Sequence, residues 1–277
     1  MKIKFIISVI SLSLILNNCS YVNIAENIII ISGSDTMLEL NENLAKEFMK
    51  NHPDISIYVK GGGTRVGIND LINNRCDIAA SSRNLLPEES MLLAKYYGSL
   101  ALVYLIAKDG LSLYVHPHNI VNDLSLIQVK DIFTGRVKNW KDVGGEDKEI
   151  ILVSRNPNSG TYQFFKEHIL EGENYSENLI TFNSTKDMIK FIKNNENAIG
   201  FGGMGFNDGV VQIRIEGIYP SEQNIRNDSY PITRYLHFLL RKSPSGNVKK
   251  FLDWVLSAAG QNIIRNSGFI SLWEYRL

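Results

Sequence analysis

The sequence predicts an α/β protein built on mainly parallel sheets. Three times near its start, a short run rich in apolar and β-branched residues is followed by a turn of small polar residues and then by a segment with helix-like features. This order of strand, turn and helix is typical of parallel strands joined by right-handed crossovers. The chain has 277 residues, 44% of them apolar, so it is long enough for two lobes or one large domain with a sizeable core.

The first part of the chain repeats this unit three times. Strands are predicted at 28–31, 55–59 and 77–80, where apolar residues run continuously or alternate. The turns that follow them lie at 32–36, 61–64 and 81–83. Helices after the turns are indicated by the spacing of Leu40, Leu44 and Phe48, by that of Ile68, Leu71 and Ile72, and by Pro87 at a first helical position.

The rest of the chain is predicted to form a second lobe and then return to the first. Residues 100–107 and 111–115 are expected as two strands separated by 108–110, where the chain crosses over. The second lobe is expected to contain a helix at 129–134, a strand at 150–153, a helix opened by 158–161, a Gly-rich strand or turn at 198–206 and a strand at 210–215. A strand at 235–240 and an amphipathic segment at 248–265 return the chain, so lobe 1 is assigned to 28–107 with 235–277 and lobe 2 to 108–234.

The charge balance limits the kind of partner. The chain has 29 Lys and Arg against 29 Asp and Glu, so its formal net charge is zero. A dedicated nucleic-acid binder depends on a basic surface, so no nucleic-acid partner is expected. Any anion that this protein binds must be held by local geometry, because no overall positive field attracts it.

The first 18 residues are predicted to be a secretory signal. Lys2 and Lys4 precede an apolar stretch at 5–16, which is shorter than the about 20 residues that a membrane-spanning helix needs. Cys19 follows with Leu16 three residues before it, which resembles a bacterial lipobox, although Asn stands at both intervening positions. We expect lipidation of Cys19 and a short tether at 19–27. The alternative is a cleaved signal beside an incidental cysteine.

The chain without its signal has one further thiol, Cys76. Because a single free thiol closes no intramolecular disulfide, the fold must depend on its core. Cys76 itself is expected to be buried and inert. Loss of Lys2 and Lys4 leaves 27 basic and 29 acidic residues, a net charge of −2.

Four turns have a composition that suits anion binding. Each places Gly beside Ser or Thr, or a pair of Ser residues, after a predicted strand and before a predicted helix: 32–36, 61–64, 81–83 and 158–161. Helix N-termini expose unpaired backbone N–H groups and carry about half a positive charge, and hydroxyls add donors. Arg155 precedes Ser159 by four residues, so its guanidinium could bind the same anion bidentately.

Two other motifs point weakly to other sites. Residues 61–67 resemble a P-loop, but no Gly-Lys-Ser/Thr follows, and Val66 stands where Gly-x-Gly-x-x-Gly requires Gly. A nucleotide site is therefore not expected. His116 and His118 are at most half of a metal site, because their loop contains no Cys, Asp or Glu partner. A surface turn is the expectation there.

Several segments in this order resemble the PstS family, the phosphate-binding lipoproteins of ABC-type phosphate importers. The resemblance covers most of the chain after the signal and runs through 33–37, 61–64 with 67–68, 77–83, 132–135, 139–145, Arg155 with 159–161, and 200–202. It implies the two-lobed fold of periplasmic binding proteins, type II-like, with a mainly parallel sheet flanked by helices in each lobe and the ligand in the cleft between them. It also implies a binding protein without catalytic residues, cofactor or metal.

The resemblance transfers the family's phosphate ligands to eight residues: Asp35, Thr36, Thr64, Ser82, Arg155, Ser159, Gly160 and Thr161. Ser34, Arg65 and Arg83 are placed at the rim of the cleft, with ion pairing as the alternative for the two arginines. Many relatives have an Asp in place of Ser82, and that Asp accepts the proton of hydrogen phosphate. We hypothesise that Asp35 has taken over this acceptor role, with helix capping as its alternative.

The function implied by the resemblance is high-affinity binding of inorganic phosphate outside the cytoplasmic membrane and delivery to the permease subunits of an ABC importer. The protein is expected to be a lipid-anchored monomer on the periplasmic face of the cytoplasmic membrane, with the outer membrane or cell surface as alternatives. Alternatives to phosphate are sulfate, molybdate or tungstate, and a surface lipoprotein acting as adhesin or sensor is a further alternative. A phosphate-ester hydrolase has weak support, because His168 lies two helical turns from Ser159 and no nucleophile elbow is present.

Overall fold

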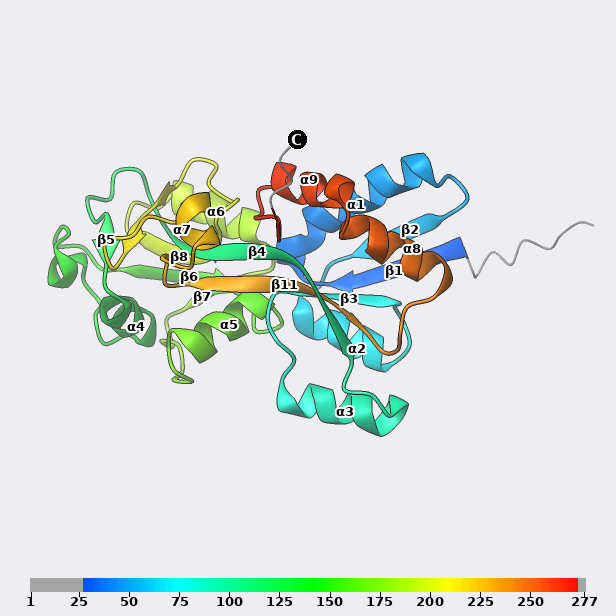
Figure 1. Ribbon diagram of the computed structural model, residues 1–277. Coiled ribbons are helices and arrows are strands. Elements are labelled where there is room, and N and C mark those ends of the chain that lie inside the picture. Colours follow the sequence, from blue (N-terminus) through cyan, green and yellow to red (C-terminus); the bar gives the residue numbers. More distant parts are fainter. Residues whose placement is uncertain (1–26, 274–277) are drawn as a thin grey trace, which may run out of the picture.

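The computed structural model describes residues 27–273 as two lobes joined by long strands (Figure 1). The predicted signal, Cys19 and the tether up to residue 26 lie outside the described residues, as do residues 274–277. Within the described part, none of the helices combines the length and hydropathy of a membrane span. One sheet runs through both lobes in the order β2 (Ser56–Lys60), β1 (Ile28–Gly33), β3 (Ile78–Ser81), β11 (Thr233–Leu240), β4 (Leu102–Val115), β8 (Ala198–Gly203), β6 (Ile151–Arg155) and β7 (Ile180–Phe182), with β9 (Val211–Gln212) beside β4.

Lobe 1 is a sheet with helices on both faces. β1 pairs in parallel with both β2 and β3, which confirms the three predicted strands. On one face lie α1 (Leu38–Asn51), α8 (Gly246–Val255) and α9 (Ala258–Asn266), and on the other lie α2 (Thr64–Ile72) and α3 (Pro87–Tyr97) (Figure 1). The first face buries Phe48 of α1 against Phe251 of α8, and the second buries Leu71 of α2 in a separate apolar cluster.

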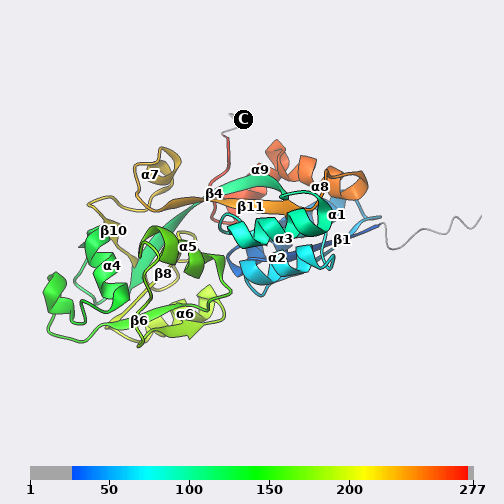
Figure 2. The same ribbon diagram turned by 90° about the horizontal axis from the view of Figure 1, so that it is seen from below.

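The prediction of two strands separated at 108–110 is wrong. β4 is one strand that leaves lobe 1 and enters lobe 2 without a turn (Figure 2). The polar residues continue the strand because β11 pairs with them in antiparallel register, with Arg234 opposite Asp109 and Thr233 opposite Gly110. The charge of Asp109, which suggests a loop in the sequence, is compensated by Arg234 on the neighbouring strand. We propose that the boundary between the lobes lies at Asp109 of β4 and Arg234 of β11.

Lobe 2 repeats the layered arrangement with different elements. β8 pairs antiparallel with β4 and parallel with β6. One face is covered by α4 (Leu126–Thr134) and α5 (Gly160–His168), where Phe165 stacks on Phe201 with ring centroids 3.7 Å apart. The other face is covered by α6 (Thr185–Lys193), which buries Met188 and Ile192. β7 and α6 were not predicted from the sequence.

Two further segments differ from the predictions. The strand expected at 210–215 is divided, because β9 pairs with β4 whereas β10 (Arg214–Ile215) pairs with β5 (Asp123–Leu124) in a separate small sheet. The amphipathic segment at 248–265 is two helices, since α8 ends at Val255 and Ser257 caps the start of α9. α7 (Glu222–Arg226) and the 3-10 turns η2 (Asp35–Met37) and η3 (Trp140–Val143) complete the described elements.

The buried His237 of β11 is expected to make stability fall in mild acid. Burial lowers the pKa of His237 to about 4, whereas the unfolded value is about 6.5. Between these values the unfolded chain binds the extra proton, so the free energy of unfolding falls as the pH decreases, by about 2 kcal/mol between pH 7 and 4.5. Urea unfolding at several pH values measures this slope, and His237→Gln is expected to flatten it. An equal slope in the variant would contradict the assignment.

Candidate anion-binding site

The carboxyl ends of three parallel strands bring three of the predicted turns together in lobe 1. Ser32 of β1 pairs with Ala79 of β3 and with Lys60 of β2, so the three chains end at the same edge of the sheet. The amide of Gly63 donates to the carbonyl of Gly33 at 3.0 Å, which ties the second turn to the first. Thr36, Thr64 and Ser82 are consequently neighbours, and all three are buried.

The second turn needs glycine for its backbone conformation. Gly62 and Gly63 have φ values of +116° and +96°, which side chains with a Cβ rarely adopt. Thr64 then starts α2, and its Oγ1 accepts a hydrogen bond from the amide of Ser82 at 3.2 Å. The N-terminus of α2 and the third turn therefore share one hydroxyl.

Lobe 2 contributes the end of β6 and the start of α5. Arg155 is the last residue of β6 and is fully buried. Ser159 caps α5, with its Oγ accepting from the amide of Thr161 at 3.2 Å. Gly160 and Thr161 form the first turn of the helix and are buried. A helix N-terminus and a guanidinium thus lie at the same strand end, as the spacing of these residues predicts.

The two sets of residues meet between the lobes. The hydroxyl oxygens of Thr36 and Thr161 are 3.0 Å apart. Asp35 Oδ2 accepts from Arg155 Nη2 at 2.7 Å. Gly160 is so close to Thr64 and Ser82 that a Cβ added to it would overlap their hydroxyl oxygens. The structure therefore brings together seven of the eight predicted ligands in direct contact, and Ser159 supports them as the cap of α5.

Arg155 is fixed by contacts from both lobes. Besides Asp35 of lobe 1, its guanidinium donates to the carbonyl oxygens of Phe182 and Asn183 and to Thr185 Oγ1 at 3.1 Å. Burial lowers the pKa of Arg155, but nearby carboxylates counteract this effect, and an arginine stays protonated. Asn183 and Thr185 were not predicted from the sequence as part of the site. Their role is to hold the arginine in place.

Arg234 is a second buried guanidinium that sequence analysis did not identify. Its Nη1 donates to Thr161 Oγ1 at 2.9 Å and to the carbonyl of Ser82 at 3.2 Å. Its Nε and Nη2 both donate to Asp109 Oδ2. One residue of the returning strand therefore contacts anion-site residues of both lobes. In the sequence, Arg234 is a single arginine beside an apolar strand. Without its partner Asp109 in view, it cannot be told from an ordinary strand residue.

The three residues predicted at the rim of the cleft, Ser34, Arg65 and Arg83, differ in burial and in their partners. Arg83 does not line the rim, because its side chain is buried and donates to both carboxylate oxygens of Glu89 at 2.7 and 2.8 Å. Arg65 is exposed at the start of α2, and its amide donates to the carbonyl of Asn158 across the lobes at 3.2 Å. Ser34 is buried, and its Oγ has no hydrogen-bond partner. Ion pairing, the alternative reading, is therefore correct for Arg83.

Two hollows border the site on the side of α1 and α6. Thr36 lines one of about 580 Å³, together with Lys186, Lys190 and Phe206. Asp35 lines the other of about 380 Å³. An ion pair of 2.8 Å between Lys186 and Glu39 connects the lobes across them. The contacts in this region show the lobes in a closed arrangement.

Two sequence expectations outside the site have clear outcomes. Cys76 is buried as expected, and burial raises the pKa of its thiol to about 12, so it is a poor nucleophile. His168 lies at the other end of α5 from Ser159 and stacks on Phe164. The Ser and His of the hydrolase alternative therefore do not form a catalytic pair.

The charges at the site balance before an anion binds. Arg155 is paired with Asp35, and Arg234 with Asp109. Burial raises the pKa of Asp109, and Arg234 opposes this shift. Any further negative charge must be stabilised by the N-termini of α2 and α5 and by hydroxyl donors. This arrangement suits a small anion rich in hydrogen-bond acceptors.

Comparison with known proteins identifies the family. The PBP superfamily domain matches residues 23–259. Over 251 residues the chain is 33% identical to the phosphate-binding protein PstS of Bacillus subtilis, with 89% of this chain and 81% of the relative covered. The chain belongs to the PstS family of phosphate-binding proteins.

Solved structures support the two-lobed fold of the PstS family. One is described as a phosphate ABC transporter substrate-binding protein with bound phosphate from Clostridium perfringens; it is 32% identical with a TM-score of 0.82 and covers 89% of this chain and 100% of that chain. Another is an ABC-type phosphate transport receptor from Vibrio cholerae, 29% identical with a TM-score of 0.74, covering 87% and 99%. PstS proteins are extracytoplasmic solute-binding proteins and are not a class of enzymes.

Proposed function

We propose that this protein binds inorganic phosphate between its lobes and delivers it to the permease of an ABC importer, without catalysing a reaction. The observation that carries the proposal is that hydroxyls and helix N-termini from both lobes converge beside Arg155. The names of the B. subtilis and C. perfringens relatives support phosphate as the ligand. Lipidation at Cys19 and a monomeric state belong to the same proposal.

Closure of the lobes is coupled to binding in this account. Thr36, Thr64 and Ser82 belong to lobe 1, whereas Arg155 and Thr161 belong to lobe 2. Only the closed arrangement gives the anion all of these donors. Phosphate therefore binds the closed state more tightly than the open state and stabilises the closed state. Arg234 is placed to assist, because it contacts Ser82 of one lobe and Thr161 of the other.

Calorimetric titration of the full chain with phosphate, arsenate and sulfate tests the proposed function. Phosphate and arsenate share a tetrahedral shape and protonation near pH 7, so both are expected to bind at one site per chain. Sulfate carries no proton at that pH and is expected to bind much more weakly. Tight binding of sulfate would make this a protein for another oxyanion, and a parallel titration with molybdate tests the remaining alternative. If neither phosphate nor arsenate bound, the proposal would be overturned.

Asp35→Asn is expected to reduce discrimination between phosphate and sulfate by about tenfold. Asp35 Oδ1 accepts from the Gly62 amide and Oδ2 from Arg155, both at 2.7 Å, and each oxygen keeps a second lone pair for a phosphate O–H. Such a bond to a carboxylate is strong, whereas sulfate offers no donor, so one of its oxygens would face a lone pair of Asp35 without a proton between them. Competition calorimetry measures the affinity ratio. An unchanged ratio would show that another group accepts the proton.

A further inference from the structure

A group of metal-ligating side chains lies at the end of the lobe 2 sheet, beyond the predicted anion ligands. β4 pairs antiparallel with β8, with Val115 opposite Ile199. His116 and His118 lie in the turn that follows β4, where the amide of Asn119 donates to the carbonyl of His116 at 2.9 Å. Glu196 lies in the turn that precedes β8, where the amide of Ala198 donates to the carbonyl of Asn195 at 3.0 Å. Because β4 and β8 are neighbours in the sheet, these two turns lie side by side at the same end of it, so residues distant in sequence meet here.

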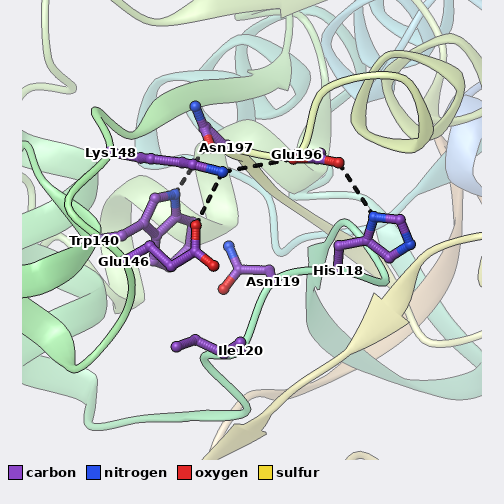
Figure 3. A pocket seen from close by; sticks show the side chains of 8 residues that line it. All are labelled: His118, Asn119, Ile120, Trp140, Glu146, Lys148, Glu196 and Asn197. Carbon is purple, nitrogen blue, oxygen red and sulfur yellow. Dashed lines mark hydrogen bonds and ion pairs between the residues drawn. The ribbon is translucent and has the colours of Figure 1, made fainter.

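The structure brings the three side chains within reach of one ion. Nδ1 of His118 lies 3.2 Å from Oε1 of Glu196 (Figure 3). The rings of His116 and His118 have centroids 4.9 Å apart. One potential ligand atom from each of the three residues lies within 4.8 Å of the others. His118 and Glu196 are exposed, so small rotations of their side chains can close the remaining distance.

The donor set indicates the class of ion. Two imidazole nitrogens and one carboxylate oxygen suit Zn²⁺, Ni²⁺ or Cu²⁺, whereas Mg²⁺ and Ca²⁺ prefer oxygen ligands alone. Zinc sites with three protein ligands complete their coordination with water. The exposure of His118 and Glu196 leaves room for such a water.

We propose that His116, His118 and Glu196 form a binding site for a divalent transition-metal ion, with zinc as its representative. Two existing contacts compete with the ion. The amide of His118 donates to Nδ1 of His116 at 3.1 Å, and this bond must be released or the ring must rotate. Lys148 Nζ lies 3.6 Å from Oε2 of Glu196, and it has a closer partner in Glu146 at 2.9 Å.

The proposed metal site is independent of the phosphate site. Its three residues are not among the predicted phosphate ligands, and two of them, His118 and Glu196, line a separate hollow of about 110 Å³ together with Trp140 and Lys148, among others. Loss of metal binding is therefore expected to leave phosphate affinity unchanged. Titration with Zn²⁺ in phosphate-free buffer therefore distinguishes failure of the metal site from failure of the proposed function.

Calorimetric titration with Zn²⁺ tests the site on the full chain, purified without a histidine tag and in phosphate-free buffer near pH 7. One ion is expected to bind per chain. His118→Asn and Glu196→Gln are each expected to weaken zinc binding by at least about tenfold. Lys148→Gln is expected to strengthen it, because a competing positive charge is removed from beside Glu196. His168→Asn, which alters a histidine outside the site, is the matched control and should have no effect.

Electron paramagnetic resonance with Cu²⁺ gives a second readout that a change in folding would not imitate. Coupling to two nitrogen nuclei is expected in the wild-type protein, and coupling to one in His118→Asn. The proposal is overturned if Zn²⁺ does not bind at concentrations of about 100 μM. It is equally overturned if the His118 and Glu196 variants bind Zn²⁺ as the wild type does.

Discussion

Replacing Arg155 by Met is expected to weaken phosphate binding by at least about a hundredfold. The guanidinium is fully buried and contacts Asp35 at the point where the lobes meet. Removing one partner of a buried, hydrogen-bonded charge pair costs about 2–5 kcal/mol or more. The loss of phosphate affinity is larger still here, because the carboxylate of Asp35 would face the bound anion without the counter-charge of Arg155. Calorimetry with phosphate measures the change.

Two further variants make the Arg155 result specific. Arg155→Lys keeps the charge but not the planar fork that reaches Thr185 and Asn183 while binding Asp35, so an intermediate loss is expected. Arg136→Gln removes an exposed arginine of the same lobe and should leave phosphate affinity unchanged. If Arg155→Met bound phosphate within about threefold of the wild type, the role assigned to this residue would be wrong.

Gly160→Ala is expected to reduce phosphate affinity by up to about a hundredfold without unfolding the protein. A Cβ at this position would lie 2.5 Å from Oγ of Ser82 in the other lobe. The added methyl group therefore acts mainly when the lobes close, and overpacking of this kind costs about 1–3 kcal/mol. Because the backbone of Gly160 is helical, Ala is tolerated locally within α5.

Thermal unfolding with and without phosphate separates an effect of Gly160→Ala on lobe closure from an effect on folding. Without phosphate, Gly160→Ala is expected to melt close to the wild type, whereas the stabilisation that phosphate gives should be much smaller. Glu167→Ala, at an exposed position of the same helix, should behave as the wild type in both conditions. Full stabilisation of Gly160→Ala by phosphate would mean that the lobes do not close on the anion as described.

Most of the lobe architecture could be predicted from the sequence because its signals are local. β-branched runs, small-residue turns and helical spacing identified β1, β2, β3, α1 and α2. β4 could not be predicted as one strand, because Lys108 and Asp109 resemble a loop until β11 is paired with them. The division of 210–215 depends in the same way on pairing with different strands.

The predicted site shows the same division between local and distant signals. The turns containing Thr36, Thr64 and Thr161 were found because each begins a helix after a strand. Arg234 was missed, since its importance depends on Asp109, which lies 125 residues away in sequence. Arg83 was assigned to the rim although Glu89, six residues later, binds it internally. Pairwise contacts of buried charges depend on the fold and leave little trace in a single sequence.

One phosphate ion is expected to be held by donors from both lobes at once. A crystal structure of the protein with phosphate would locate the ion and its donors. We expect a tetrahedral ion within about 2.6–3.1 Å of the hydroxyls of Thr36, Thr64, Ser82 and Thr161 and of the guanidinium of Arg155. Phosphate bound to one lobe only, or at another place on the molecule, would contradict the account.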